Sequence, residues 1–383
     1  MLTPIFDRWL GELFDSPIPD ETEATCSDCA MRPPESGPRD GSAIYFTEDK
    51  CCTYFPTLHN YLAGGVLADA APEAAPGKAA LERLLAARIG VSPLAVAAPP
   101  PYWPLYHSSN QSFGRSKALR CPYFQVETGA CGVWRHREST CATWFCKHDR
   151  GAVGLAFWGA VRTLLSSVED AVAMHCLVEL DVGHEALAAL LAGSGEPSAT
   201  EIDGDVDLPS YTRKWGRWLG REREFFVRSQ EIAAGLPWQS ALALSGVKGR
   251  AQALLARDAH ALLLSTEAPL VPLRLGRFSV TQASPTALKL QTYREYDLLE
   301  VPPSLYAALR RFDGRPTGAV VAEVALQEGL DLTNDVLRML ADFEVLVPAE
   351  ASRTPDTAGT RSAEAPGVRP GPPATAPRDG RRS

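Results

Sequence analysis

GAVGLAFWGAVRTLLSSVEDAVAMHCLVELDV, residues 151–182, is the stretch that decides the fold class. Large apolar residues such as Leu155, Trp158 and Val161 recur in it at steps of three and four, which is the period of one helix face. Further helical patterns follow along the chain at 184–191, 211–234 and 237–264. The middle of the chain, 151–268, is therefore predicted to be largely helical.

The pattern changes after Pro269 to short strands and short helices. We expect strands over 270–280, 287–291, 297–301 and 343–347. We expect helices over 304–312, 317–328 and 333–342. These elements predict a small α+β domain over 270–348. The tail, 350–383, has almost no large apolar residues, so it cannot bury enough surface to offset its ordering entropy, and we expect it to be disordered.

The first 150 residues are predicted to form one irregular domain. A short apolar helix is expected over 5–14 and a second helix over 79–89. Segments rich in Ala, Pro and Gly interrupt the region, so we treat about 68–115 as an insertion between two groups of cysteines. The fold class is thus predicted to be α+β and mainly helical, with an irregular cysteine-cluster domain over 1–150, a helical middle and a small C-terminal domain.

The composition limits the classes of function. A length of 383 residues suggests two or three domains, and a net charge of −8 argues against a general nucleic-acid binder. The first residues lack the charged leader and apolar run of a secretory signal. No uninterrupted apolar stretch of about 18 residues or more occurs. We therefore expect a cytoplasmic protein without a membrane span.

Nine cysteines need an explanation in such a protein. Reducing conditions disfavour structural disulfides, and the odd number argues against complete pairing. Eight cysteines fall into two groups, which are Cys26, Cys29, Cys51 and Cys52, and then Cys121, Cys131, Cys141 and Cys146. Four thiolates suit both tetrahedral zinc and a 4Fe–4S cluster. We predict that these eight residues are ligands of zinc or of an iron–sulfur cluster.

The number of centres stays open at this point. Neighbouring side chains of an extended backbone point to opposite faces, so Cys51 and Cys52 serve two centres more easily than one. The eight thiols suit two four-ligand sites, or one cluster with spare or redox-active thiols. Histidines that could substitute as ligands are His59, His107, His136 and His148. Cations that would favour metal-binding thiolates are Arg135, Arg137, Lys147, His148 and Arg150.

Two plainer interpretations stand beside this one. Free cysteine is often a buried apolar residue, and some of the eight could have that role. For Cys176, which stands alone in the long helix, burial is the interpretation we favour. A bound metal could also be purely structural, without any chemistry of its own.

The second cysteine group carries a resemblance to a known family. Its motifs are Cys121-Pro122-Tyr123-Phe124, Gly129-Ala130-Cys131-Gly132-Val133-Trp134, Arg137-Glu138-Ser139-Thr140-Cys141 and Phe145-Cys146. In this order they resemble the second half of the CxxCxxCC (YkgJ-like) family, whose members are described as zinc- or iron-chelating. The resemblance covers 26–148 and implies metal binding without implying a reaction. The family packs its early cysteines into one short stretch, whereas a long segment separates Cys29 from Cys51 here.

The C-terminal domain resembles a second family. An aliphatic strand pair, an Asp313-Gly314 turn and a closing edge at 340–347 are similar to PqqD-like winged-helix domains, over 285–348. That resemblance implies peptide capture by strand addition at an exposed sheet edge. A winged helix that only packs against the rest of the chain or helps it dimerise is the alternative. DNA ranks below both, because basic residues do not cluster on one predicted helix.

Residues 213–223 mix basic and aromatic side chains. They suit either an anion or nucleic-acid surface, or an amphipathic helix with Trp215, Trp218 and Leu219 turned inward. Interleaved glutamates favour the amphipathic helix. The motifs of phosphate-binding loops, zinc proteases and serine hydrolases are absent from the sequence.

The sequence thus predicts a metal- or iron–sulfur-cluster-binding accessory protein. The main alternative is a metal-dependent enzyme or partner protein in peptide or protein modification, which recruits its substrate through 285–348. A metal-dependent regulator that uses its winged helix on DNA is a third, weaker interpretation.

Overall fold

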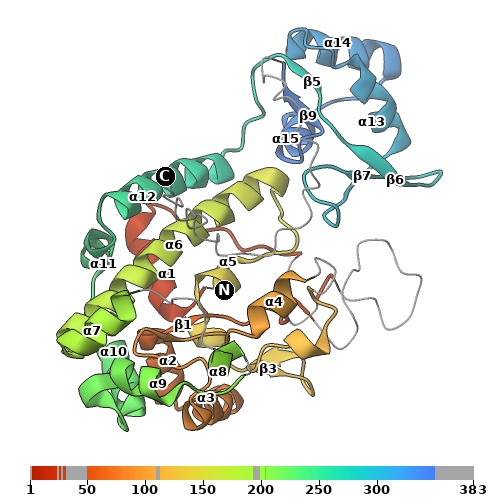
Figure 1. The fold of residues 1–383 in the computed structure, drawn as a ribbon. Helices are drawn as coiled ribbons and strands as arrows, with labels where there is room; N and C mark the ends of the chain where they lie inside the picture. The colour runs from red at the N-terminus through yellow and green to blue at the C-terminus, as the bar shows by residue number, and fades with distance from the viewer. Residues whose placement is uncertain are drawn as a thin grey trace, which may run out of the picture.

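The computed structural model describes residues 2–23, 26, 29–31, 50–108, 113–192, 199–202 and 204–349. Within them the chain is mainly helical with a few short strands in small sheets, which confirms the predicted fold class. Figure 1 shows a large helical body up to α12 and a smaller body that begins at β5. The tail that we expect to be disordered lies outside the described residues.

Helix α6, Gly151–Glu179, runs through the centre of the large body (Figure 1). Its apolar face, which includes Phe157 and Val161, is fully buried against α1 (Pro4–Leu13), α11 (Trp238–Leu244) and α12 (Gly246–Leu264). By length and composition α6 is apolar enough to cross a membrane, but the core helix of a folded body passes the same test. Because so much of α6 is covered by other helices, it does not indicate a membrane span.

Helix α2, Asn60–Ala68, is an element that the sequence analysis did not predict. Two adjacent glycines weaken its helical pattern, and both are required by close packing. A Cβ atom on Gly64 would lie 1.9 Å from the carbonyl oxygen of Phe226 in α10, Glu222–Gly235. The two glycines weaken the helical pattern in the sequence, but because they lack a Cβ atom they also allow α2 to pack closely against its neighbours.

Two predicted helices are each broken in two by glycines with positive φ. The segment 211–234 forms α9 (Leu208–Trp215), a 3₁₀ turn and α10, with φ +49° at Gly216 and +82° at Gly220. The segment 237–264 divides into α11 and α12 at Gly246. Apolar periodicity continues across these breaks, so it could not reveal them.

Other expected elements of the large body lie close to their predicted bounds. Helix α3 spans Ala75–Ala87, and α7 spans His184–Leu191 as predicted. A short helix, α8, at Ala199–Ile202 lies between the predicted helices 184–191 and 211–234, while 193–198 and 203 lie outside the described residues. The cysteine region adds α4 (Tyr102–His107), α5 (Ser139–Thr143), the strand pair β1 (Leu58–His59) with β2 (Ala95–Val96), and the pair β3 (Phe124–Gln125) with β4 (Ala130–Cys131).

The smaller body contains two sheets. Strand β5 (Leu273–Leu275) pairs antiparallel with β9 (Leu346–Pro348). A three-stranded antiparallel sheet has the order β6 (Ser279–Ala283), β7 (Leu288–Gln291) and β8 (Leu299–Val301). The single strand predicted over 270–280 is therefore two strands in different sheets. The break lies at Gly276, where a Cβ atom would be 2.0 Å from the carbonyl oxygen of Glu344.

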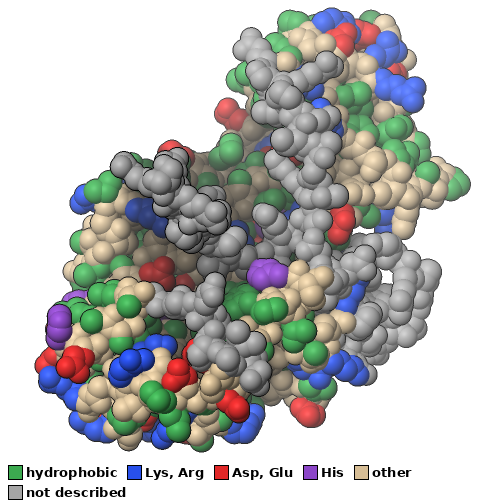
Figure 2. Space-filling model, in the orientation of Figure 1, with side chains coloured by type: hydrophobic (Ala, Val, Ile, Leu, Met, Phe, Trp, Pro, Cys, Tyr) green, Lys and Arg blue, Asp and Glu red, His purple; other side chains and the backbone are tan. Residues whose placement is uncertain are grey.

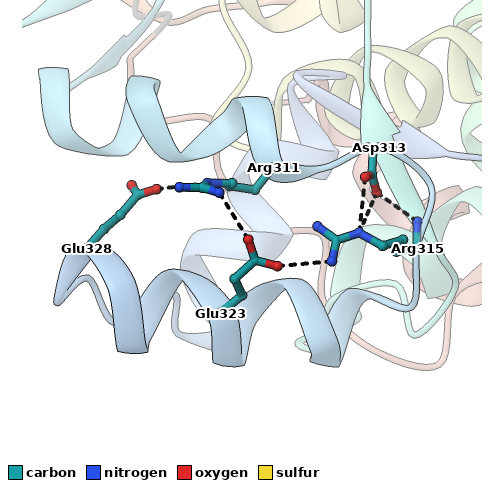
Figure 3. Close-up of polar contacts among 5 residues, drawn as sticks. All are labelled: Arg311, Asp313, Arg315, Glu323 and Glu328. Carbon is teal, nitrogen blue, oxygen red and sulfur yellow. Dashed lines mark hydrogen bonds and ion pairs between the residues drawn. The ribbon is translucent and has the colours of Figure 1, made fainter.

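The helices of this body are α13 (Pro303–Ala308), α14 (Thr317–Glu328) and α15 (Asn334–Asp342). They bury an apolar core against the sheets. An ion-pair network ties the turn at Asp313 to α14: Arg315 binds Asp313 at 3.0 Å and Glu323 at 2.9 Å, and Arg311 binds Glu323 and Glu328 (Figure 3). These pairs are partly exposed, so the apolar core contributes more to stability than they do.

Candidate metal centre

The structure brings the eight cysteines of the two groups into one region. Burial raises the pKa of Cys146, and so do the charges of three thiols from distant stretches, Cys29, Cys51 and Cys26. Burial is also the largest effect that raises the pKa of Cys141, to which the thiols of Cys121 and Cys131 add. Thiols that are far apart along the chain are therefore neighbours in space.

Backbone contacts fix several of these thiols. The amide of Cys121 donates to the carbonyl oxygen of Cys52 at 2.7 Å. The β3–β4 pair places Cys131 opposite Phe124. Cys141 lies in the first turn of α5, where the carboxylate of Glu138 caps the helix and accepts from the Cys141 amide at 2.7 Å.

The adjacent pair has a backbone that the sequence analysis did not expect. Cys51 begins a turn, in which the amide of Tyr54 donates to the carbonyl oxygen of Cys51 at 3.2 Å. The interaction between the thiols of Cys51 and Cys52, together with burial, raises the pKa of Cys51. The same interaction lowers the pKa of Cys52, but burial and the neighbouring thiols outweigh it, so the pKa of Cys52 is also raised. The two side chains thus meet, because a turn replaces the extended backbone on which the expectation of opposite faces depended.

Two buried cations lie beside the thiols. Cys26 is exposed, yet desolvation by the surrounding chain raises the pKa of its thiol to about 11, whereas the charges of Arg137 and Lys50 favour its thiolate. Lys50 is 4% exposed and Arg137 is 7% exposed. The ammonium of Lys50 donates to the carbonyl oxygen of Cys26 and, at 2.8 Å, to that of Gly129.

Of the cations expected to favour thiolates, the structure places Arg137 among the sulfurs. Arg135 pairs instead with Asp69, and Arg150 with Asp342. Lys50 is a buried cation of the candidate site that was not predicted, although its position directly before Cys51 was a usable signal.

The sulfurs are neighbours without a shared centre. Among the residues that the structure describes, no three or more Cys, His, Asp or Glu side chains converge as a metal site. Ligation would therefore require the thiols to turn about their Cα–Cβ bonds and to lose their protons. The donor set itself, eight sulfurs with cationic neighbours, has the chemistry that zinc and iron–sulfur clusters prefer.

The histidines that could substitute as ligands have other partners. His59 lies 3.1 Å from a carboxylate oxygen of Asp170, and His136 lies 2.8 Å from one of Asp69. His148 contacts the hydroxyl of Tyr293, and His107 stacks on Trp103. Cys176 is fully buried in the α6 core, as expected, with its sulfur 3.5 Å from the carbonyl oxygen of Ser229. The four histidines thus have other partners in the structure, and the eight cysteines stay the predicted donor set.

The smaller body covers part of this site through the segment between β7 and β8, residues 292–298. Tyr296 is buried with Met31, and Cys29, Cys51 and Cys146 pack against this pair. Arg294 donates to the carbonyl oxygen of Phe145 at 2.8 Å, and its guanidinium lies over the rings of Trp144 and Tyr296. Nothing in the sequence marked this segment as part of the site.

The aromatic and basic segment 213–223 has a structural role. Trp215 and Trp218 are buried, while Arg217 pairs with Asp181 and Arg221 pairs with Glu224. Leu219, which we expected to face inward, is 40% exposed. Where Figure 2 shows described residues, basic side chains are interspersed with acidic ones. These observations support the amphipathic interpretation of the segment.

Comparisons with known proteins identify no relative of this chain. No family model, curated protein or solved structure matches the chain. The resemblances to the CxxCxxCC and PqqD-like families therefore stay predictions that rest on the motifs quoted above.

Proposed function

We propose that this chain is a metal- or iron–sulfur-cluster-binding accessory protein, with the eight clustered cysteines as its ligands. The observation that carries the proposal is the meeting of these thiols beside the buried cations Lys50 and Arg137. Thiols that served only as apolar packing would not need buried positive charge next to them, since burying a charge is costly. Thiolates that hold a metal do benefit from it.

The sulfur-only donor set restricts the metal. Soft thiolate ligands select zinc, copper(I) or iron–sulfur clusters over hard cations such as magnesium. A bound cluster would supply one-electron transfer, and bound zinc would brace the irregular fold. In either case Lys50 and Arg137 offset the negative charge that four or more thiolates bring into a buried region.

Metal analysis of the full chain tests this proposal. We expect protein purified without oxygen to contain either iron with acid-labile sulfide, and a brown colour, or colourless stoichiometric zinc. Serine at Cys121 and Cys131 together should lower the metal content per chain, whereas Cys176→Ser should leave it unchanged. A chain that contains no metal, and takes up none when given zinc or ferrous iron with sulfide, would refute the proposal.

A second candidate function is recruitment of a peptide or protein for modification. The observation that favours it is the outer strand of the three-stranded sheet. Within the described chain β6 pairs with β7 alone, and all five of its residues, Ser279–Ala283, are exposed. An edge of this kind can accept an extended peptide through backbone hydrogen bonds.

Its test compares the full chain with an edge variant. Thr281→Pro removes a backbone donor from β6 and should weaken binding to an array of extended peptides. Leu326→Ala, at an exposed position of α14, is the matched control and should bind as the unmodified chain does. Equal binding by both variants would argue against recruitment at β6.

A further inference from the structure

Helix α12, Gly246–Leu264, carries apolar side chains on two opposite faces. One face packs on α6 and α11 and contributes Ala253, Ala256 and Leu263 to the core of the large body. The opposite face points to solvent, and Figure 1 shows the helix at the outer surface of that body. Four large apolar side chains of this outer face are more than half exposed, which are Val247, Leu254, Leu255 and Leu262.

These residues belong to a concentration of exposed apolar surface. Of the sixteen large apolar side chains that are exposed in the described part of the chain, eight lie between residues 244 and 271. Apolar residues that are exposed singly need no explanation, whereas a larger apolar patch marks a site of interaction. A helix that is apolar on both sides is typically covered on both sides. The outer face of α12 therefore has the character of an interface.

The outer face of α12 has the same spacing when it is read from either end. Six exposed residues follow one line along the helix, at steps of four, three, one, three and four: Val247, Ala251, Leu254, Leu255, Asp258 and Leu262. We call these six residues the α12 stripe. An interface between two identical chains brings the same patch of both together, so the patch has to be self-complementary. Two antiparallel copies of the stripe place Val247 opposite Leu262, and Leu254 opposite Leu255.

The charges of α12 fit the same arrangement. Asp258 is the one acidic residue of the helix and lies within the stripe. Antiparallel pairing brings it level with Ala251 of a second copy and next to Arg250 of that copy. Both Asp258 and Arg250 are exposed, and neither has an ion-pair partner within the described part of the chain. A two-fold axis would therefore create two Asp258–Arg250 pairs between the copies.

Other covers for the stripe fit less well than a second copy does. A membrane would have to accept the carboxylate of Asp258 among its acyl chains, which is costly. The tail, 350–383, has Val368 as its one large apolar residue, so it has little to pack against the stripe. A second copy supplies both the apolar side chains and the cation for Asp258.

We infer that α12 is the interface through which two copies of this chain form an antiparallel, two-fold symmetric dimer. The inference goes beyond the proposed function, because nothing in this interface depends on a bound metal. The contact of Leu254 with Leu255 of the second copy forms the centre of the interface. The Asp258–Arg250 pairs fix the register of the two helices.

Sedimentation velocity of the full chain over a range of concentrations tests the dimer, with a reductant present so that the free thiols form no cross-links. Leu254→Glu with Leu255→Glu places like charges at the centre of the interface. Leu326→Glu is the matched control, because Leu326 is an exposed leucine of α14. Circular dichroism checks that each variant keeps its helix content.

We expect the unmodified chain and the control to reach twice the mass of one chain as the concentration rises. The two glutamates should raise the dissociation constant of the dimer by about tenfold or more, because both leucines lose their apolar contact. A chain that stays monomeric, or that dimerises equally well with the two glutamates, would overturn the inference. A monomer that binds vesicles of phosphatidylcholine and phosphatidylserine through the stripe would also overturn it, in favour of a membrane-binding surface.

Exchange of the two charges tests the register of the dimer. Asp258→Arg alone and Arg250→Asp alone each bring like charges together, so each should weaken the dimer. Both substitutions in one chain restore opposite charges and should return the dissociation constant towards that of the unmodified chain. A double variant that dimerises no better than the weaker single variant would overturn the antiparallel arrangement.

Discussion

The cysteine region and the smaller C-terminal body use different means to hold their folds. The C-terminal body has short regular elements around a continuous apolar core, with Val320, Val324 and Leu340 fully buried. The cysteine region has turns, two-residue strand pairs and a set of mostly half-buried cysteines in place of such elements. The first arrangement stabilises itself by apolar burial, whereas the second gains most from a ligand that joins distant segments.

Removal of metal should have the largest effect on stability, and it should destabilise the cysteine region and not the C-terminal body. Structural zinc stabilises small thiolate domains by about 10 kcal/mol or more, so the cysteine region should lose most of its protection without metal. Hydrogen exchange followed by mass spectrometry, with and without a chelator, measures this region by region. We expect faster exchange over 113–146 and little change over 299–348. Equal changes in both regions would contradict the comparison.

A substitution in the apolar core of the C-terminal body should have the next largest effect, and it should destabilise that body and not the cysteine region. Leu340 is fully buried in α15, so Leu340→Ala should lower the free energy of unfolding of the C-terminal body by about 2–5 kcal/mol. Urea denaturation measures the loss. Leu326→Ala is the control, since Leu326 is 86% exposed. Metal content should stay unchanged in both variants, and a loss of metal from Leu340→Ala would show that the two regions fold as one.

A buried carboxyl group at the border of the cysteine region predicts a pH dependence. Burial raises the pKa of Glu169 from 4.5 to about 8, although its carboxylate accepts from the Ser139 amide at 2.9 Å. The folded state therefore binds this proton more tightly than the unfolded state does. Its stabilising contribution is complete below pH 4.5 and is lost as the pH rises towards 8.

Glu169→Gln should reduce this pH dependence, because an amide keeps an acceptor for Ser139 without a titrating proton. The unmodified chain should lose on the order of a few kcal/mol between pH 5 and pH 8 through this group, and the variant should lose less. Urea denaturation at the two pH values tests it, with Asp258→Asn at an exposed position as the control. Equal losses in Glu169→Gln and the unmodified chain would exclude Glu169 as the source.

The smallest effect is expected at the ion-pair network of Figure 3. Glu323→Gln removes the charge that both Arg311 and Arg315 bind, but these side chains are partly exposed and solvent screens them. The melting temperature of the C-terminal body should fall by less than in Leu340→Ala, and the difference should shrink further at high salt. A fall as large as that of Leu340→Ala would mean that the network, and not the core, holds the body.

The sequence predicted those helices whose position depends on the spacing of their own apolar residues. The period of α6 and the bounds of α7 and α14 followed from apolar spacing. The breaks at Gly216 and Gly246 did not, because a positive φ leaves apolar spacing unchanged. Helix α2 was missed because its glycines, needed for close packing, lower its helical signal.

The candidate site shows the same limit more strongly. Cysteine spacing was enough to propose the eight ligands, since that signal lies in residue type. It could not show that Cys146 packs with Cys29 and Cys51, or that Tyr296 covers them, because those contacts join segments separated by at least 95 residues along the chain. Cysteine spacing also could not predict the turn at Cys51, because no proline or glycine lies within that turn.

The segment 292–298 has a thermodynamic consequence for the whole molecule. It leaves the three-stranded sheet at β7, returns to it at β8, and in between places Tyr296 against Cys29, Cys51 and Cys146. A peptide that extends the sheet at β6 and a metal bound by these cysteines would then be two ligands of one connected unit. If the bound metal strengthens peptide binding by some factor, the peptide must strengthen metal binding by the same factor, so metal retention would report on peptide occupancy.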